Sequence, residues 1–134
     1  MRQAVLSMME RHLTAFNAGR YGRSPEDCAY PFPIHIGGEL ILITSPAAME
    51  DALNAHRAAA WELGVRSIWG EVKSIESDGP TSCRLTMKWS YRRRGAEAFT
   101  GVSHRYISVR GAQPRVAMLE VERLGVPTDF RKAA

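Results

Sequence analysis

The chain has 134 residues, of which 45% are hydrophobic and 24% charged. This size and composition are typical of one globular domain and exclude a disordered or fibrous protein. Glu10 and Arg11 interrupt the apolar start before a secretion signal can form, and no apolar run is long enough to cross a membrane. We therefore expect a cytoplasmic protein.

The net charge of +4 is unevenly distributed. Residues 84–115 contain eight basic side chains and one acidic side chain, Glu97. The net charge is therefore +7 in this stretch and −3 in the rest of the chain. The two cysteines, Cys28 and Cys83, show neither a CxxC spacing nor a histidine motif for metal binding. We expect two buried or half-buried thiols in a reducing compartment, with no disulfide, metal centre or cofactor.

The first half of the chain alternates between helical and extended patterns. Apolar residues at three-and-four spacing predict an amphipathic helix over residues 2–18, and Gly19 ends it. Ser24 followed by Pro25 is typical of a short helical turn. The next segment, Tyr30-Pro31-Phe32-Pro33, is predicted to be an extended edge because proline lacks the backbone donor that a central strand needs.

A hairpin and a second helix complete this half. Two runs rich in β-branched residues flank Gly37-Gly38, which indicates a tight hairpin turn. Ser45 and Pro46 then give the capping pattern of a helix over residues 47–63, which Gly64 terminates.

The second half of the chain reads as consecutive strands. Turn residues separate four extended runs, at 65–76, 81–92, 98–110 and 115–123. The order of these elements predicts an α+β fold, in which a strongly curved, mostly antiparallel sheet carries the N-terminal helices on its concave face. Such a cone contains a pocket. Residues 125–134 are predicted to be a loose C-terminal tail.

One strand divides into two faces of different chemistry. Its apolar face consists of Cys83, Leu85, Met87, Trp89 and Tyr91, and its basic face of Arg84, Lys88 and Arg92. A two-residue turn near Gly95 would place His104 and Tyr106 of the next strand on the apolar face, and Arg105 on the basic face. A bulge would reverse this assignment.

Across residues 1–121 the chain resembles the nuclear-transport-factor-two-like superfamily, the cone-shaped α+β domain shared with SnoaL-like and ketosteroid-isomerase-like proteins. The residues that carry the resemblance are Phe16-Asn17-Ala18-Gly19, Tyr30-Pro31-Phe32-Pro33, Ser45-Pro46, Trp89 and Tyr106. It is most similar to uncharacterised small bacterial members. The resemblance implies a cystatin-like single domain over residues 1–124, a pocket and a homodimer. Members range from enzymes to binding and scaffold proteins.

Several side chains are candidates for a site within the cone. His104 can act as a general acid or base, and Tyr30 can donate a hydrogen bond to a ligand carbonyl. The expected ligand-binding residues are Tyr106, Trp89, Met87, Tyr91 and His12, the last from the inward side of the first helix. For each of these residues a purely structural role is the competing interpretation. Asp27, an acid near the expected pocket entrance, is not assigned the role of a base.

Two functional hypotheses follow, and whether the protein is an enzyme stays open between them. In the first, the cone binds a small, partly apolar molecule and carries cofactor-independent acid–base chemistry of an isomerase, dehydratase or hydrolase type. In the second, the protein is a non-catalytic homodimeric binding or scaffold module that uses the outer face of the sheet. Anion or nucleic-acid binding by the basic strands is a weaker option, because the aromatic residues lie on the opposite face. No membrane partner is expected.

Overall fold

The computed structural model describes residues 2–111 and 113–132 of the protein. The order of elements up to β6 matches the sequence prediction, and the structure has helices α1 and α2, strands β1 to β6 and two 3-10 turns. Their bounds are α1 Arg2–Ala18, η1 Ser24–Asp27, β1 Phe32–Ile36, β2 Glu39–Ile43, α2 Pro46–Glu62, β3 Ser67–Ser77, β4 Ser82–Arg93, β5 Ala96–Ser108, β6 Arg115–Arg123 and η2 Phe130–Lys132.

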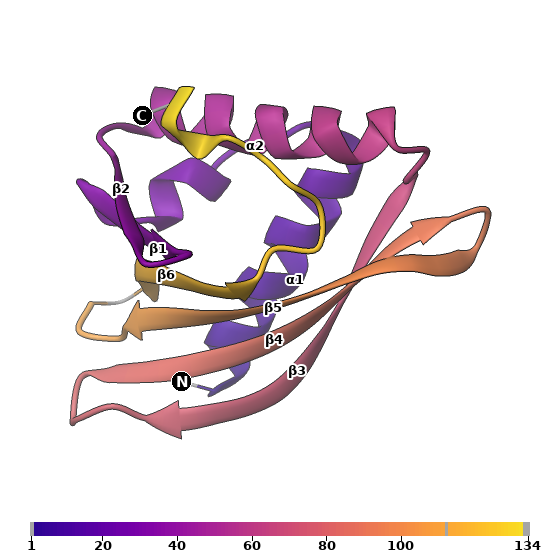
Figure 1. Ribbon diagram of the computed structural model, residues 1–134. Coiled ribbons are helices and arrows are strands. Elements are labelled where there is room, and N and C mark those ends of the chain that lie inside the picture. The colour runs from indigo at the N-terminus through magenta and orange to yellow at the C-terminus, as the bar shows by residue number, and fades with distance from the viewer. Residues whose placement is uncertain (1, 112, 133–134) are drawn as a thin grey trace.

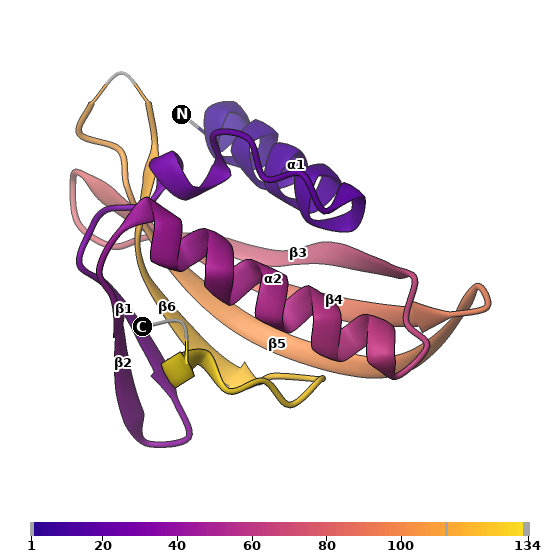
Figure 2. The ribbon, with the colours of Figure 1, turned by 90° about the horizontal axis from the view of Figure 1, so that it is seen from above.

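The six strands form one curved sheet in the order β2-β1-β6-β5-β4-β3, and only the β1–β6 pair among them is parallel. The two helices lie side by side over the concave face of this sheet, and the segment after β6 crosses back towards α2 (Figures 1 and 2). The predicted α+β cone, with a mostly antiparallel sheet and helices on its concave face, is therefore confirmed.

Local signals in the sequence account for the helix boundaries. The Ser45 hydroxyl accepts a hydrogen bond from the Ala48 backbone amide at 3.1 Å and so caps α2. At the end of α1, the Asn17 side chain both donates to and accepts from the backbone of Ile68. Arg57 of α2 donates to the backbone carbonyls of Phe16 and Asn17 in the last turn of α1. These contacts hold α1 against β3 and α2.

The segment after β6 is ordered and packed, so the expectation of a loose tail was wrong for residues 125–132. Val126 is 1% exposed and Phe130 is 8% exposed. Thr128 contacts His56 of α2 through a 2.7 Å hydrogen bond. The remaining two residues of the predicted tail, 133 and 134, lie outside the described residues. This segment closes one side of the cone.

A bulge in β5 reverses the predicted face assignment. The β4–β5 turn is the expected two-residue one, since Arg93 pairs with Ala96, but Tyr91 pairs with Phe99 and Arg92 with Glu97. Ala98 is therefore an extra residue on β5, and a one-residue slip exchanges the two faces of a strand. The prediction that His104 and Tyr106 lie inside, with Arg105 outside, was wrong.

Candidate functional site

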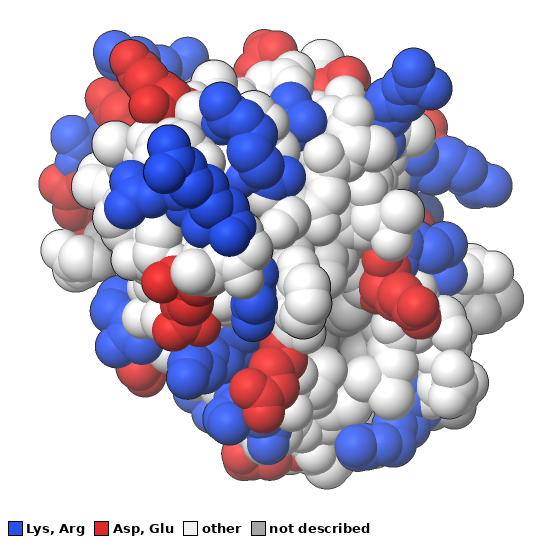
Figure 3. Space-filling model, turned by 90° about the vertical axis from the view of Figure 1, so that its right-hand side faces the viewer, with Lys and Arg blue, Asp and Glu red and all other residues white. Residues whose placement is uncertain are grey.

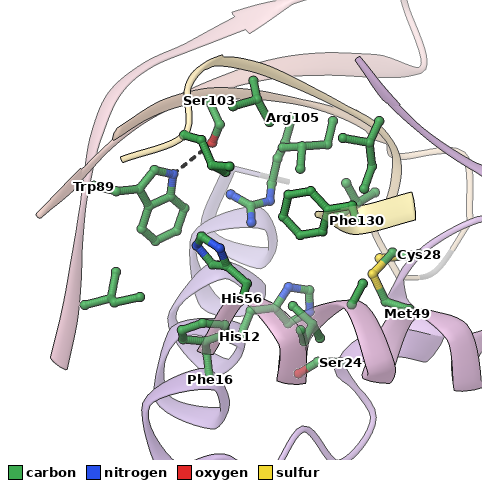
Figure 4. A pocket seen from close by; sticks show the side chains of 18 of the residues that line it. His12, Phe16, Ser24, Cys28, Met49, His56, Trp89, Ser103, Arg105 and Phe130 are labelled. Carbon is green, nitrogen blue, oxygen red and sulfur yellow. Dashed lines mark hydrogen bonds between the residues drawn. The ribbon is translucent and has the colours of Figure 1, made fainter. Parts of the chain in front are cut away.

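A cavity of about 170 Å³ lies between the helices and the concave face of the sheet. Apolar side chains from α1, α2, the strands and the C-terminal segment form most of its wall, among them Phe16, Met49, Trp89, Leu119 and Phe130. The polar and charged groups on the wall include His12, His56, Ser103 and Arg105 (Figure 4). A mostly apolar cavity with a few convergent polar groups is the usual form of a small-molecule site.

His12 and Asp27 form a hydrogen-bonded pair at one side of the cavity. His12 lies on α1, and Asp27 ends η1, which follows the reversal of the chain after Gly19. His12 Nε2 is 2.8 Å from Asp27 Oδ2, and the imidazole is 15% exposed. When neutral, the ring donates its Nε2–H to the carboxylate, which leaves the Nδ1 lone pair as an acceptor.

Burial lowers the pKa of His12, and the hydrogen bond to Asp27 opposes this effect. The imidazole is therefore neutral at pH 7. A neutral imidazole whose orientation and tautomer are fixed by a carboxylate is the arrangement of a general base. This pair was not predicted from the sequence, which indicated His12 as a pocket residue and Asp27 as an isolated acid.

Arg105 reaches the cavity from β5, where the bulge has turned it inward. Its neighbours across the sheet are Leu85 on β4 and Leu119 on β6. The guanidinium lies 5.1 Å from the centre of the Trp89 ring, and Figure 4 shows it directed into the pocket beside Phe130. Burial lowers the pKa of Arg105. Arginine nevertheless keeps its proton inside proteins, so a positive charge lies within an apolar cavity.

Ser103 lies next to Arg105 on the same face of β5. It is 6% exposed, and its hydroxyl oxygen accepts a 2.8 Å hydrogen bond from Trp89 Nε1. Because the indole nitrogen is only a donor, the Ser103 proton is free to be donated in turn. Trp89 thus contributes an apolar face to the cavity and also orients a hydroxyl on its wall.

His56 and Tyr91 also line the cavity, but their polar atoms are occupied by protein partners. The Tyr91 hydroxyl donates to the Leu124 carbonyl at 3.0 Å and accepts from His56 Nε2 at 2.8 Å. His56 Nδ1 then accepts from the Thr128 hydroxyl at 2.7 Å. Burial lowers the pKa of His56 to about 4, so the ring is neutral at pH 7. This chain of hydrogen bonds fastens the C-terminal segment to α2 and β4.

The other predicted site residues lie elsewhere. His104 is on the convex face, with its ring 2.9 Å from Thr86 Oγ1 and 3.4 Å from Glu122 Oε1. Tyr106 accepts a hydrogen bond from Arg84 on the same face. Tyr30 donates its hydroxyl proton to the Pro25 carbonyl, which supports η1 from outside the cavity. Met87 belongs to the hydrophobic core and does not line the cavity. Of the predicted residues, the structure brings His12, Trp89 and Tyr91 together.

Acidic residues interrupt the basic outer face. Arg84 is 3.7 Å from Glu120 of β6, the kind of neighbour across the sheet that the sequence allowed. Figure 3, which shows the molecule from the right-hand side of Figure 1, likewise has basic and acidic side chains interspersed around an uncharged region. Cys28 and Cys83 are both buried, as predicted.

Within the described residues, no helix has the length and apolar character needed to cross a bilayer. The same part of the chain also brings together no group of three potential metal ligands among its histidine, cysteine and acidic side chains.

The cone of curved sheet and covering helices is the nuclear-transport-factor-two-like fold, also called cystatin-like. The comparison with solved structures shows this directly. An NTF-2-like protein of unknown function from Shewanella oneidensis superimposes with a TM-score of 0.67 at 11% identity, covering 90% of this chain and 97% of that one. The predicted resemblance in fold is thus confirmed. Neither a protein-family model nor a curated protein matches the sequence.

Two further structures with more specific names are similar in fold. Aln2 from a Streptomyces species has a TM-score of 0.70 at 15% identity, with 91% of this chain and 89% of that chain covered. A putative aromatic ring hydroxylase from Novosphingobium aromaticivorans has a TM-score of 0.63 at 12% identity, with 99% and 96% covered. At these identities the similarity establishes the fold, and function has to be argued from the site.

Proposed function

We propose that the protein binds a small, partly apolar molecule inside the cone and that His12, oriented by Asp27, transfers a proton to or from it. The observation that carries this proposal is that His12, on the wall of an open apolar cavity, is hydrogen-bonded to Asp27. A neutral base in a mostly apolar site is suited to removing a proton from a carbon next to a carbonyl. Such a step requires no bound cofactor.

The size of the cavity favours a compact ligand. An apolar cavity of about 150 Å³ holds benzene, so about 170 Å³ accommodates a molecule with one ring and a small substituent. The open interior also supports ligand binding over the scaffold hypothesis, which requires no such space. The homodimer and the cytoplasmic location remain predictions from the resemblance and the composition.

Exchange of hydrogen for deuterium tests the proposed chemistry without knowledge of the natural substrate. One-ring ketones such as acetophenone are incubated with the protein in D₂O, and loss of the α-proton signal is followed by NMR. We expect exchange above background, at least a hundredfold slower in His12→Gln and also slower in Asp27→Asn. His35→Gln, at an exposed histidine, is the matched control. Binding with no exchange in the wild-type protein would refute the catalytic part of the proposal.

Binding is measured separately, by ligand-observed NMR with the same one-ring compounds. Phe16→Trp is a suitable probe of the pocket, since it adds bulk to the wall of the cavity. We expect this variant to bind at least tenfold more weakly than the wild type. Equal binding by both proteins would place the ligand outside the cone.

A further inference from the structure

Arg105 is a half-buried residue whose guanidinium points into the cavity and has no counter-ion among the described residues. Its Nη1 atom is inaccessible to solvent and has no hydrogen-bond partner within residues 2–111 and 113–132. No carboxylate in this part of the chain lies within ion-pair distance of the guanidinium, although five pairs between an arginine or lysine and a carboxylate are present there. Arginine side chains are almost never buried in this way unless they are paired.

The surroundings of Arg105 do not compensate its charge. Trp89 offers the face of its ring at 5.1 Å, a weaker partner than a carboxylate. The titratable groups that act on Arg105 are Cys28 and Tyr91, and burial raises the pKa of both, to about 11 for the thiol. Both groups are therefore neutral at pH 7. His12, on which the charge of Arg105 also acts, is neutral as well.

An unpaired charge in the interior does not stabilise a fold, because no attraction to an opposite charge offsets the free-energy cost of removing it from water. Arginine also cannot relieve the cost by releasing its proton. The Ser103 hydroxyl, which already accepts from Trp89, supplies a second donor on the same wall. A planar guanidinium and an adjacent hydroxyl are complementary to a carboxylate, which accepts hydrogen bonds through two oxygens.

We propose that the ligand of the cone is a one-ring organic anion whose carboxylate binds Arg105 and Ser103 while its apolar part contacts Trp89 and Phe130. This inference rests on the proposed function, because it specifies the chemical class of molecule that the cavity takes. The anion neutralises Arg105 and completes the hydrogen bonds of its guanidinium. The ring of the ligand occupies the apolar part of the cavity, on the side of His12.

Benzoate and benzamide test this assignment, because they have the same shape and differ in charge. Binding of each is measured by ligand-observed NMR at fixed ionic strength, with thermal shift as a second readout. For the wild-type protein we expect benzoate to bind at least tenfold more tightly than benzamide, since a hydrogen bond to a charged group is stronger than a neutral one. Arg105→Met is expected to lose this preference.

Arg110→Met is the matched control, because it removes an exposed arginine of the same basic stretch, and it should keep the preference for benzoate. Arg105→Lys retains the charge without the planar fork and should show a reduced preference, which provides a second variant if the methionine variant fails to fold. Equal binding of both compounds by the wild-type protein overturns the anion assignment and leaves small-molecule binding intact. Binding of neither compound overturns both proposals.

Discussion

Replacing His56 with glutamine should remove much of the pH dependence of stability between pH 5 and pH 7. His56 is neutral in the folded protein, where Nε2–H donates to Tyr91 and Nδ1 accepts from Thr128. A proton on Nδ1 would place a positive charge in the interior. The pKa is therefore about 4 in the folded state, against 6.5 for an exposed histidine.

The sign and size of the effect follow from these two values. Below pH 6.5 His56 takes up a proton in the unfolded chain, whereas in the folded protein it takes up a proton only near pH 4. Acid therefore favours unfolding. Linkage then gives a loss of about 2 kcal/mol from this residue between pH 7 and pH 5. That is a large part of the roughly 5–15 kcal/mol by which domains are stable.

Urea denaturation at pH 7 and at pH 5 measures the effect directly. The wild-type protein should lose about 2 kcal/mol more than His56→Gln over this interval, although the variant is less stable at pH 7 because it loses buried hydrogen bonds. His35→Gln, at an exposed position, should behave like the wild type. If His56→Gln and the wild-type protein lose the same free energy between the two pH values, the argument that His56 is held neutral is wrong.

Three further changes test other parts of the structure. Phe130 is 8% exposed, so Phe130→Ala should lower the free energy of unfolding, measured by urea denaturation, by about 3 kcal/mol. The control Lys132→Ala, at an exposed residue, should leave it almost unchanged. Equal effects of the two substitutions would mean that the C-terminal segment is not packed. A Cβ on Gly101 would lie 3.0 Å from the Arg123 carbonyl oxygen, so Gly101→Ala should lower the free energy of unfolding by about 1–3 kcal/mol. Gly111→Ala is the control, because the nearest atom to its Cβ would be 3.9 Å away, and it should not lower the stability. Asp27→Asn removes the carboxylate charge that raises the pKa of His12, so the acidic limb of any exchange reaction should move to lower pH in this variant. An unchanged limb would exclude His12 as the base.

Much of the fold could be predicted because its signals are local. The helix after Ser45-Pro46 and the hairpin around Gly37-Gly38 depend on caps and turns that are determined by a few adjacent residues. The hydrogen-bond register of β5 depends instead on one bulged residue, Ala98, which has no distinctive sequence signal. Because side chains alternate along a strand, that single residue moved every later side chain of β5 to the other face.

The site was harder to predict because its polar groups come together from distant segments. Neither face of β5 is uniformly apolar in the sequence, so the sequence did not show which face is buried. Phe99 and Ile107, near the two ends of the strand, lie on its inward face and are the only signal that could have shown it. The pairing of His12 with Asp27 depends on how the chain reverses between α1 and η1, which helix periodicity does not determine. The packing of Val126 and Phe130 likewise depends on the tertiary structure, since their segment has no regular pattern.

Arg105 and His12 should be coupled through the charge of the ligand. Burial is the main cause of the lowered pKa of His12, and the charge of Arg105 lowers this pKa further in the free protein. A bound carboxylate would neutralise that cation and so raise the pKa of His12, making the base stronger at the moment when substrate is present. An NMR titration of the His12 ring should therefore show a higher pKa with benzoate than without it, and no such increase in Arg105→Met. A pKa of His12 that is unchanged by saturating benzoate would show that the two groups act independently.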